Sequence, residues 1–534
     1  MYLMIVEYIF SRFHFFQSQS NDFVSNQSAT NADGSGVSQP RPRDIPSQSP
    51  TLQGSSGHAE ITSFVRQHQT ASFLSKKMTE QNRRNIDNIL LDLFTKDLQP
   101  FSIVEDAGFK AFTNALNPRY ELPNRKYISK VLIPARFEEC RNNSQIKIEN
   151  AYELSLTTDL WTSQNTESFI AITVHFISYF KLESILLDCK QINGHHTSEN
   201  IFNSIKTTCE EWHILNKINF AITDNAVNIK NAIQNYTTWK HIPCFAHNLN
   251  LIVKSAININ NLNLLIHNVR IIVKHFKRST TASEKLKTYQ TTSGRNPQKL
   301  SHDVPTRWNS TYTMLDRFIL LEEPLKATIA IINKNLPHMS QEEWEILHEL
   351  VVILKPIETA TKIISGEKYP TASIVIRLIS GLQNICNKLK QKDFSANSQH
   401  IINNIEDGIQ NRFATIESNT VLKISTLLDP RFKNAFLPKK NPGLITEETK
   451  IIMEIDQYLR GEFYNRDGNP LIWWEQHQHQ FPSLTKLVER LFCIVATTVP
   501  CERIFSKAGL ILNEKRNRLH ADKLSMLLFL NCNT

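Results

Sequence analysis

The hydrophobic and polar positions of this chain show two periodicities, one typical of strands and one typical of helices. Between residues 152 and 192, short runs rich in β-branched residues are separated by polar turns, which predicts successive strands of a meander. Further on, strand-like runs alternate with runs of helical spacing, and this order predicts a mixed α/β sheet with helices on its faces. The expected elements are strands at 154–160, 169–178, 180–192 and 218–222, helices at 197–212 and 225–234, and a strand-to-helix step over 241–256.

Helical spacing dominates the rest of the chain. Residues 258–462 have long helical periodicities, as in EEWEILHELVVILKPIETATKII, with almost no strand signal, and therefore predict an α-helical insertion. Upstream, apolar residues recur at helical spacing behind Thr79, which can cap a helix. Downstream, a Trp-bearing loop precedes three helices, of which the last, at 521–531, is apolar on nearly all sides.

These changes of pattern divide the chain into five parts. Residues 1–58 begin with an apolar stretch that is too short and too charged to span a bilayer, and continue with Ser, Gln, Asn, Gly and Pro. We expect this part to be a disordered leader and linker, because it cannot bury enough apolar surface to offset the entropy of ordering. The other parts are a helical unit at 59–150, the first part of the sheet domain at 151–257, the α-helical insertion at 258–468, and a C-terminal helical region at 469–534 that completes the core.

Composition and charge narrow the classes of function. The chain is 41% apolar and 21% charged, which is ordinary globular usage, and its 14 glycines argue against a glycine-rich cofactor-binding fold. A net charge of +9 favours a polyanionic partner, with nucleic acid first, although many enzymes of this size reach a similar charge. No stretch predicts a membrane span, so we expect no membrane partner and no small-molecule cofactor.

The cysteines exclude two kinds of framework. Eight are scattered singly, without a C-x-x-C pair, so the sequence predicts neither a zinc ribbon nor a set of disulfides. Single thiols fit a reducing compartment, either cytosol or nucleus.

Two aspartates follow predicted strands. Asp159 ends the first strand and Asp224 comes just after the strand at 218–222. Side chains at the carboxyl ends of strands face the crevice where ligands collect, and paired carboxylates suit Mg²⁺ or Mn²⁺ in phosphoryl transfer. The alternative is that each aspartate only caps the turn or helix that follows it.

A resemblance adds to this picture. The C-terminal stretch FPSLTKLVERLFCIVATTVPCERIFSKAGLILNEKRNRL resembles the dimerisation segment of hAT transposases and of the zinc finger BED domain-containing proteins descended from them. Further blocks resemble the same family in the same order, from about residue 78 to 531: DLQPFSIVEDAGFKAFTNALNPRYELPNRKYIS, the two aspartate blocks, HIPCFAHNLNLIV, DVPTRWNSTYTML and LLDPRFK. The resemblance implies a ribonuclease-H-like mixed sheet interrupted by the all-α insertion, with a DNA-binding helical unit before it.

The resemblance also implies a catalytic triad. The matching acidic residues are Asp159, Asp224 and Glu502, which would bind Mg²⁺ or Mn²⁺ if the protein is catalytic. Glu502 alone would be explained by the dipole of the helix that starts near Pro500. Pro500 and Cys501 stand where the relatives tend to have small hydroxyl residues, a change that could tilt this helix.

Other residues receive roles from the same resemblance. Trp308 matches a tryptophan that stacks on a flipped base in active relatives, and Arg307 beside it could bind phosphate; the alternative for a tryptophan on a helix is a core position. Cys244 and His247 lack two further zinc ligands, so we expect His247 either to lie near the active face and contact the cleaved DNA strand or simply to be packed. The remaining predicted residues are Arg125 and Lys126 for DNA binding, and Phe505, Leu524, Leu527, Leu528 and Leu530 for dimerisation.

The sequence leaves more than one function open. The first hypothesis is a nuclear, homodimeric or larger hAT-type transposase that binds DNA and cleaves and joins strands. The second is a host-adopted DNA-binding dimer that regulates transcription without cutting; the unusual leader, the Pro500–Cys501 change and the lack of any cysteine before residue 140 for a BED zinc finger favour it. A metal-dependent nuclease without transposition is a third.

Overall fold

The computed structural model describes residues 78–163, 166–304, 307–332, 334–433, 447–512 and 519–534. The predicted disordered leader at 1–58 lies outside the described residues. The chain divides into two compact units, a smaller one that ends at Ile133 and a larger one that runs from Pro134 to Thr534. Each unit is described by itself.

The smaller unit is helical in its described residues, and the helix after it, at 133–150, belongs to the larger unit from Pro134 onward. Its first helix begins behind Thr79, whose side chain accepts a hydrogen bond from the amide of Asn82 at 3.4 Å. Tyr120 donates a hydrogen bond of 2.6 Å to Asp87 and so ties the end of the unit to this helix. The elements are the α-helices α3 (Glu80–Thr95), α4 (Ala107–Leu116) and α5 (Arg125–Tyr127), the 3-10 helix η1 (Phe101–Glu105) and the π-helix η2 (Ile128–Leu132).

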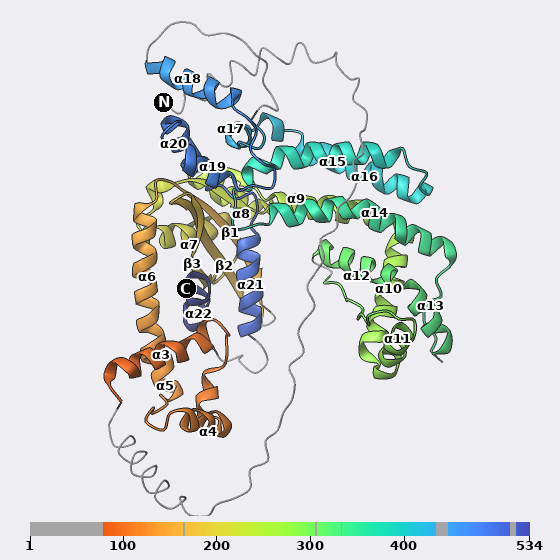
Figure 1. The fold of residues 1–534 in the computed structure, drawn as a ribbon, viewed down its shortest axis with the longest axis horizontal. Coiled ribbons are helices and arrows are strands. Elements are labelled where there is room, and N and C mark those ends of the chain that lie inside the picture. The colour runs from red at the N-terminus through yellow and green to blue at the C-terminus, as the bar shows by residue number, and fades with distance from the viewer. Residues whose placement is uncertain (1–77, 164–165, 305–306, 333, 434–446, 513–518) are drawn as a thin grey trace, which may run out of the picture. The chain divides into compact units, whose positions relative to one another are not determined.

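A five-stranded mixed sheet is the centre of the larger unit (Figure 1). The strand order is β3-β2-β1-β4-β5; the first three strands form an antiparallel meander, and β1, β4 and β5 run parallel. The predicted meander and mixed sheet are therefore confirmed. The strands are β1 (Leu154–Thr162), β2 (Ser168–Ser178), β3 (Lys181–Gln191), β4 (Ile218–Thr223) and β5 (Lys240–Pro243).

Helices from both ends of the larger unit surround this sheet. Two C-terminal helices pack on it: α21 contacts β1 and β2, and α22 contacts the edge strand β3. The side chain of Asn533 accepts from the amide of Leu186 at 3.0 Å and donates to its carbonyl at 2.9 Å, and so satisfies two backbone groups of this edge strand. The helices outside the insertion are α6 (Ile133–Asn150), α7 (Ser198–Glu211), η3 (Leu215–Lys217), α8 (Val227–Tyr236), α9 (Phe245–Ile257), α19 (Pro470–His477), α20 (Pro482–Leu491), α21 (Val499–Ile511) and α22 (Ala521–Asn533).

The insertion between α9 and α19 is all-α wherever the structure describes it. It joins the sheet domain mainly through α16, which packs against α9. Among the described residues no helix is both long and apolar enough to cross a membrane. The helices are α10 (Asn260–Arg278), α11 (Thr280–Thr292), α12 (Trp308–Leu320), α13 (Glu322–Ile331), α14 (Gln341–Ile364), η4 (Ala372–Ile374), α15 (Val375–Lys390), α16 (Ala396–Phe413), η5 (Ile416–Ser418), α17 (Thr420–Leu428) and α18 (Glu447–Arg460).

Candidate catalytic face

Two of the predicted acidic residues lie side by side at the ends of neighbouring strands. In the parallel pair β1 and β4, Thr157 is the register partner of Ile222, so two residues further along Asp159 comes next to Asp224. Adjacent strands lie about 5 Å apart, which leaves the two carboxyl groups as neighbours. Each also accepts a local backbone hydrogen bond, Asp159 from Leu160 at 2.8 Å and Asp224 from Ala226 at 3.1 Å. One oxygen of each carboxyl group therefore makes the local hydrogen bond that the capping alternative predicts.

The third acidic residue arrives on α21. Cys501, in its first turn, is fully buried against the sheet, with its sulfur 3.6 Å from the hydroxyl of Thr157 and 3.8 Å from the carbonyl of Ala171. Pro500 occupies the first turn, where its missing N–H costs no helical hydrogen bond. Pro500 and Cys501 therefore start the helix in contact with the sheet. Glu502 is the next residue, and it lies near Asp159 at the end of β1.

The pKa of Asp159 responds to both of the other acidic residues. The pKa of Asp159 is raised from its ordinary 3.8 to about 7. Burial is the largest cause, the negative charges of Asp224 and Glu502 also raise the pKa, and the hydrogen bond from Leu160 lowers it. Residues that are 278 positions apart in sequence, Asp224 and Glu502, therefore both act on the same carboxyl group.

An arginine of the insertion reaches the same place. Arg307 lies 3.3 Å from Glu502 in an ion pair that is open to solvent, with 54% and 37% of the two side chains exposed. Four residues earlier in the chain, Asp303 has a fully buried side chain that accepts hydrogen bonds from Arg270 at 2.7 and 2.9 Å and from Thr311 at 3.0 Å. Burial alone would raise the pKa of Asp303, but the hydrogen bond and charge of Arg270 outweigh it and hold the pKa below its ordinary value.

The described residues contain no group of three or more His, Cys, Asp or Glu side chains arranged closely enough to hold a metal ion. Asp159, Asp224 and Glu502 are thus electrostatically coupled but do not form a ready cage of ligands. Glu502 is paired with Arg307, whereas Asp159 and Asp224 lie at the ends of neighbouring strands.

The C-x-x-H segment positions the third acidic residue. Cys244 caps α9: its sulfur accepts from the amides of His247 at 3.4 Å and Thr498 at 3.3 Å. The amide of Phe245 donates to the carbonyl of Ala496 at 2.9 Å. Burial raises the pKa of the Cys244 thiol to about 11, so the group is a neutral acceptor. The segment therefore holds the turn that leads into α21, while His247 itself is half-buried on α9.

One buried histidine was missed by the sequence reasoning. His175, in the middle of β2, is hydrogen-bonded to Thr157 at 3.0 Å and to Ser184 at 2.6 Å. Burial lowers its pKa to about 3, so the ring is neutral. Its one signal in the sequence is a polar ring within the apolar strand FIAITVHFIS. Because Thr157 also contacts Cys501, the hydrogen bonds of His175 help to fix the part of the sheet on which the first turn of α21 packs.

The predicted DNA-binding residues are found in different surroundings. Trp308 opens α12 and is only 4% exposed, so stacking on a base requires the ring to leave its buried position. Arg307 is exposed but paired, as described above. In the smaller unit, Arg125 lies 3.3 Å from Glu105, and Lys126 is exposed.

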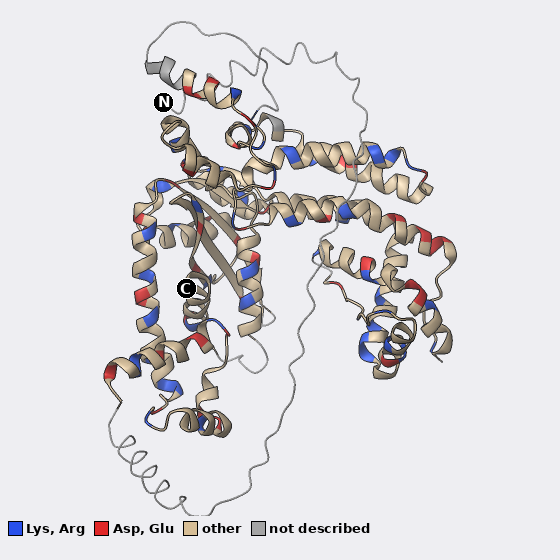
Figure 2. Cartoon of the chain, in the orientation of Figure 1, with Lys and Arg blue, Asp and Glu red and all other residues tan. Residues whose placement is uncertain are grey.

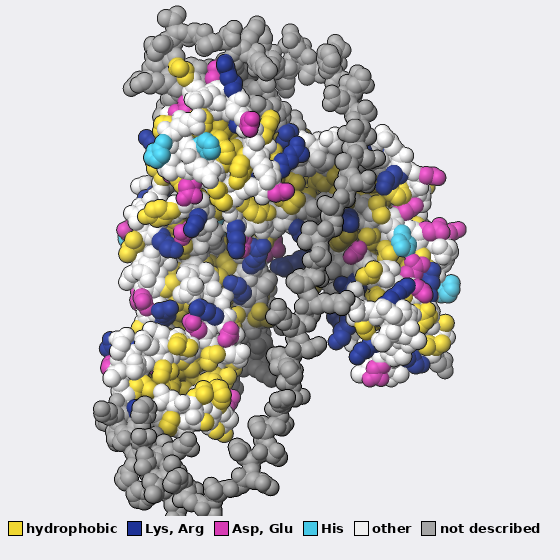
Figure 3. Space-filling view, in the orientation of Figure 1, with side chains coloured by type: hydrophobic (Ala, Val, Ile, Leu, Met, Phe, Trp, Pro, Cys, Tyr) yellow, Lys and Arg dark blue, Asp and Glu magenta, His cyan; other side chains and the backbone are white. Residues whose placement is uncertain are grey.

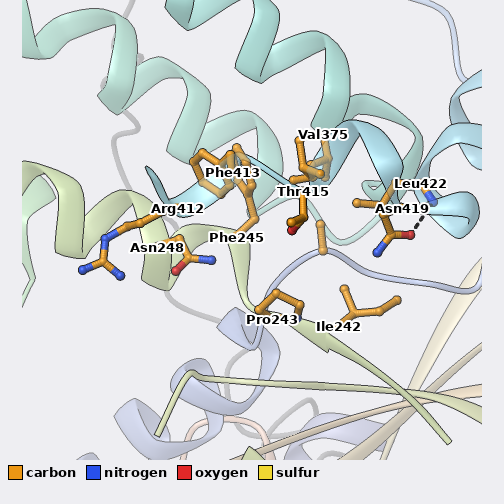
Figure 4. A pocket seen from close by; sticks show the side chains of 12 residues that line it. Ile242, Pro243, Phe245, Asn248, Val375, Arg412, Phe413, Thr415, Asn419 and Leu422 are labelled. Carbon is orange, nitrogen blue, oxygen red and sulfur yellow. Dashed lines mark hydrogen bonds between the residues drawn. The ribbon is translucent and has the colours of Figure 1, made fainter. Parts of the chain in front are cut away.

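A cavity of about 110 Å³ lies where the insertion meets the sheet domain (Figure 4). Its wall includes Phe245 and Phe413, whose rings stack at 4.8 Å, together with the polar side chains of Asn248 and Arg412. None of the three acidic residues lines it. The cavity therefore belongs to the joint between α9 and α16 and not to the catalytic face.

Comparison with known proteins identifies these parts. Residues 157–240 match the ZBED1 RNase-like domain, residues 242–353 the ZBED1 RNase-like helical domain, and residues 454–534 the hAT family C-terminal dimerisation region. The chain belongs to the family of hAT transposases and zinc finger BED domain proteins. The predicted ribonuclease-H-like fold with its helical insertion is confirmed.

Relatives within this hAT family are distant. Human "Zinc finger BED domain-containing protein 4" is 23% identical over 84% of the chain and 43% of its own length. "Putative AC transposase" of Zea mays is 22% identical over 80% of the chain and 62% of its length. Human "Zinc finger BED domain-containing protein 6" is 24% identical over 70% and 40%. The chain thus spans 40 to 62% of the length of these relatives.

The predicted dimerisation residues lie inside the hAT protomer. Phe505 stacks on Trp161 of β1 at a centroid distance of 5.8 Å, which holds α21 on the sheet. On α22, Phe529 contacts Phe137 at 4.8 Å and Trp212 at 5.9 Å. A contact with a second subunit through these side chains would require them to leave the core. At most 2% of each of the following α22 side chains is exposed: Leu524, Leu527, Leu528 and Leu530.

Proposed function

We propose that this hAT family member is a nuclear, DNA-binding homodimer that cleaves and joins DNA strands at Asp159, Asp224 and Glu502. The observation that carries the proposal is the placement of Asp159 and Asp224 at the ends of neighbouring strands, with Glu502 in the first turn of α21, which packs on the sheet; the charges of Asp224 and Glu502 both raise the pKa of Asp159. Perturbed acidic groups of this kind cluster at functional sites.

The chemistry of the donors fits a divalent cation. The charges of Asp224 and Glu502 oppose ionisation of the buried Asp159, and a hard cation bound between them would remove that repulsion. Carboxylate oxygens are ligands that Mg²⁺ and Mn²⁺ prefer. Asp159 and Asp224 would hold the ion first, and Glu502 would join them. A bound ion of this type activates a water or hydroxyl and stabilises the leaving oxygen in phosphoryl transfer.

We propose that Arg307 binds a phosphate of the DNA. Because its ion pair with Glu502 is exposed, the pair contributes at most about 1 kcal/mol. A phosphate of the DNA can therefore displace Glu502 from Arg307 at little cost. Glu502 is then free to face the two aspartates, and Arg307 orients the strand.

The test is strand transfer with a labelled DNA end in Mg²⁺ or Mn²⁺. We expect the wild-type protein to join strands and Asp224→Asn to lose at least about a hundredfold in rate, because the amide removes a charged ligand. Asp316→Asn is the control, since Asp316 is exposed on α12. Equal rates for the wild type and Asp224→Asn would remove the catalytic proposal.

A second function is favoured by a different observation. Glu502 is occupied by Arg307, Trp308 is buried, and the described residues include no ready metal cluster. These features fit a DNA-binding, transcription-regulating dimer that no longer cuts. Binding of DNA without any cleavage by the wild type, at several Mg²⁺ and Mn²⁺ concentrations, would select this function.

A further inference from the structure

The positive charge of this chain is concentrated in one part of the insertion. Residues 254–299 contain nine Lys and Arg and a single Glu, an excess of eight positive charges. The whole chain carries +9, so all other residues together contribute only one. Helices α10 and α11 make up most of this segment, and Figure 2 shows Lys and Arg along both.

Three of these cations form one exposed group at the end of α10. Lys274 lies three positions before Lys277 and four before Arg278, so the three share one side of the helix. All three are exposed, and within the described part of the chain none has an acidic partner. Arg270 and Arg295, by contrast, are each paired with an acidic residue. We call Lys274, Lys277 and Arg278 the α10 basic group.

The helix dipole explains only part of this charge. Lys277 and Arg278 lie in the last turn of α10, where partial negative charge favours cations. Lys274 lies before that turn, and Lys287 on α11 and Lys299 after it are also exposed and outside any last turn. Unpaired cations repel one another in the free protein, so their concentration points to an anionic partner with several charges.

The α10 basic group is linked to the catalytic face through Arg270, Asp303 and Arg307. Arg270, one turn earlier on the same side of α10, holds the buried Asp303. Asp303 lies four residues before Arg307 in the sequence, and Arg307 pairs with Glu502. A strand held at the catalytic face and a backbone held on α10 would thus be bound by connected parts of the same unit.

We propose that the α10 basic group, with Lys287 and Lys299, binds the phosphate backbone of duplex DNA beside the segment that enters the catalytic face. Figure 3 shows basic side chains gathered on this part of the surface. The inference rests on the proposed function for its partner, duplex DNA. It goes beyond that function because no acidic residue takes part, so it predicts binding and not cleavage.

The test compares DNA affinity at several salt concentrations for the full chain and a triple variant, Lys274→Gln, Lys277→Gln and Arg278→Gln. Each lost phosphate contact lowers the slope of log affinity against log salt by about 0.9. The triple variant should therefore lose up to about 3 in slope and on the order of a hundredfold in affinity at about 0.1 M salt. The matched control removes the same charge from other exposed lysines, Lys355→Gln, Lys388→Gln and Lys392→Gln, and should leave the slope within about 1 of the wild type.

Separate readouts distinguish this inference from the proposed function. Asp159→Asn should abolish strand transfer and keep both affinity and salt slope, whereas the triple variant should lose both. If the wild type binds DNA through the α10 basic group but never cleaves, the inference stands and the catalytic proposal fails. An unchanged slope in the triple variant, an equal loss in the control, or tighter binding of duplex RNA of the same length would overturn the inference.

Discussion

Asp159 should make the folded protein less stable at high pH, and this effect can be measured without DNA. Its carboxyl group has a pKa of about 7 in the folded state and 3.8 ordinarily, so the folded chain holds the proton more tightly than the unfolded chain. The stability that this provides is present below pH 3.8 and is lost as the pH rises through about 7. A pKa difference of about 3, at about 1.4 kcal/mol for each unit, corresponds to about 4 kcal/mol.

Asp159→Asn removes this cost, because the amide is neutral and its oxygen can still accept the hydrogen bond from Leu160. We expect the free energy of unfolding at about pH 8.5 to rise by up to about 4 kcal/mol, and the gain to shrink towards pH 4. Urea unfolding followed by tryptophan fluorescence at several pH values measures it.

The exposed Asp316→Asn again serves as the control and should change stability by no more than about 0.5 kcal/mol at any pH. Mg²⁺ should stabilise the wild type more than Asp159→Asn. If Asp159→Asn is no more stable than the wild type at high pH, burial and the charges of Asp224 and Glu502 do not raise the pKa of Asp159.

Three further predictions concern the surroundings of this site. His175 has a pKa of about 3 in the folded state, so the stability that its neutral ring provides is complete above pH 6.5 and is lost as the pH falls. Between pH 7 and 5 the wild type should therefore lose about 2 kcal/mol of its free energy of unfolding, and His175→Gln should lose less, as measured by urea unfolding. Asn533→Leu leaves two backbone groups of Leu186 without partners and should cost about 1 to 3 kcal/mol, whereas Asn533→Gln tests how strictly the geometry is set. Arg307→Gln should tighten Mn²⁺ binding by no more than about fivefold in calorimetric titration, because an exposed ion pair contributes about 1 kcal/mol at most; a larger change, or weaker binding, would mean that Arg307 does more than occupy Glu502.

Local pattern was enough to predict the sheet. The strands at 154–162, 168–178 and 181–191 bury alternating or continuous runs of β-branched residues, and their bounds lie within two residues of those expected. The pairing of Asp159 with Asp224 followed from a general rule about strand ends, which depends only on the order of the elements.

Residues whose environment is made by distant segments could not be predicted in this way. The apolar sides of α22 showed that the helix must be buried, but not that β3, Phe137 and Trp212 of the same chain bury it. Likewise, the sulfur of Cys244 accepts a hydrogen bond from the amide of Thr498, a contact across 254 residues, in addition to capping α9. Periodicity carries no information about such partners.

The position of α21 on the sheet has a consequence for synthesis of the protein on the ribosome. β1 and β4 are complete by residue 223, yet Cys501 and Phe505, which cover β1, emerge only after the entire insertion. At about 5 to 20 residues per second, this delay is roughly 15 to 55 s. During that time one apolar side of the nascent sheet stays open, so we expect chaperones to bind the growing chain there.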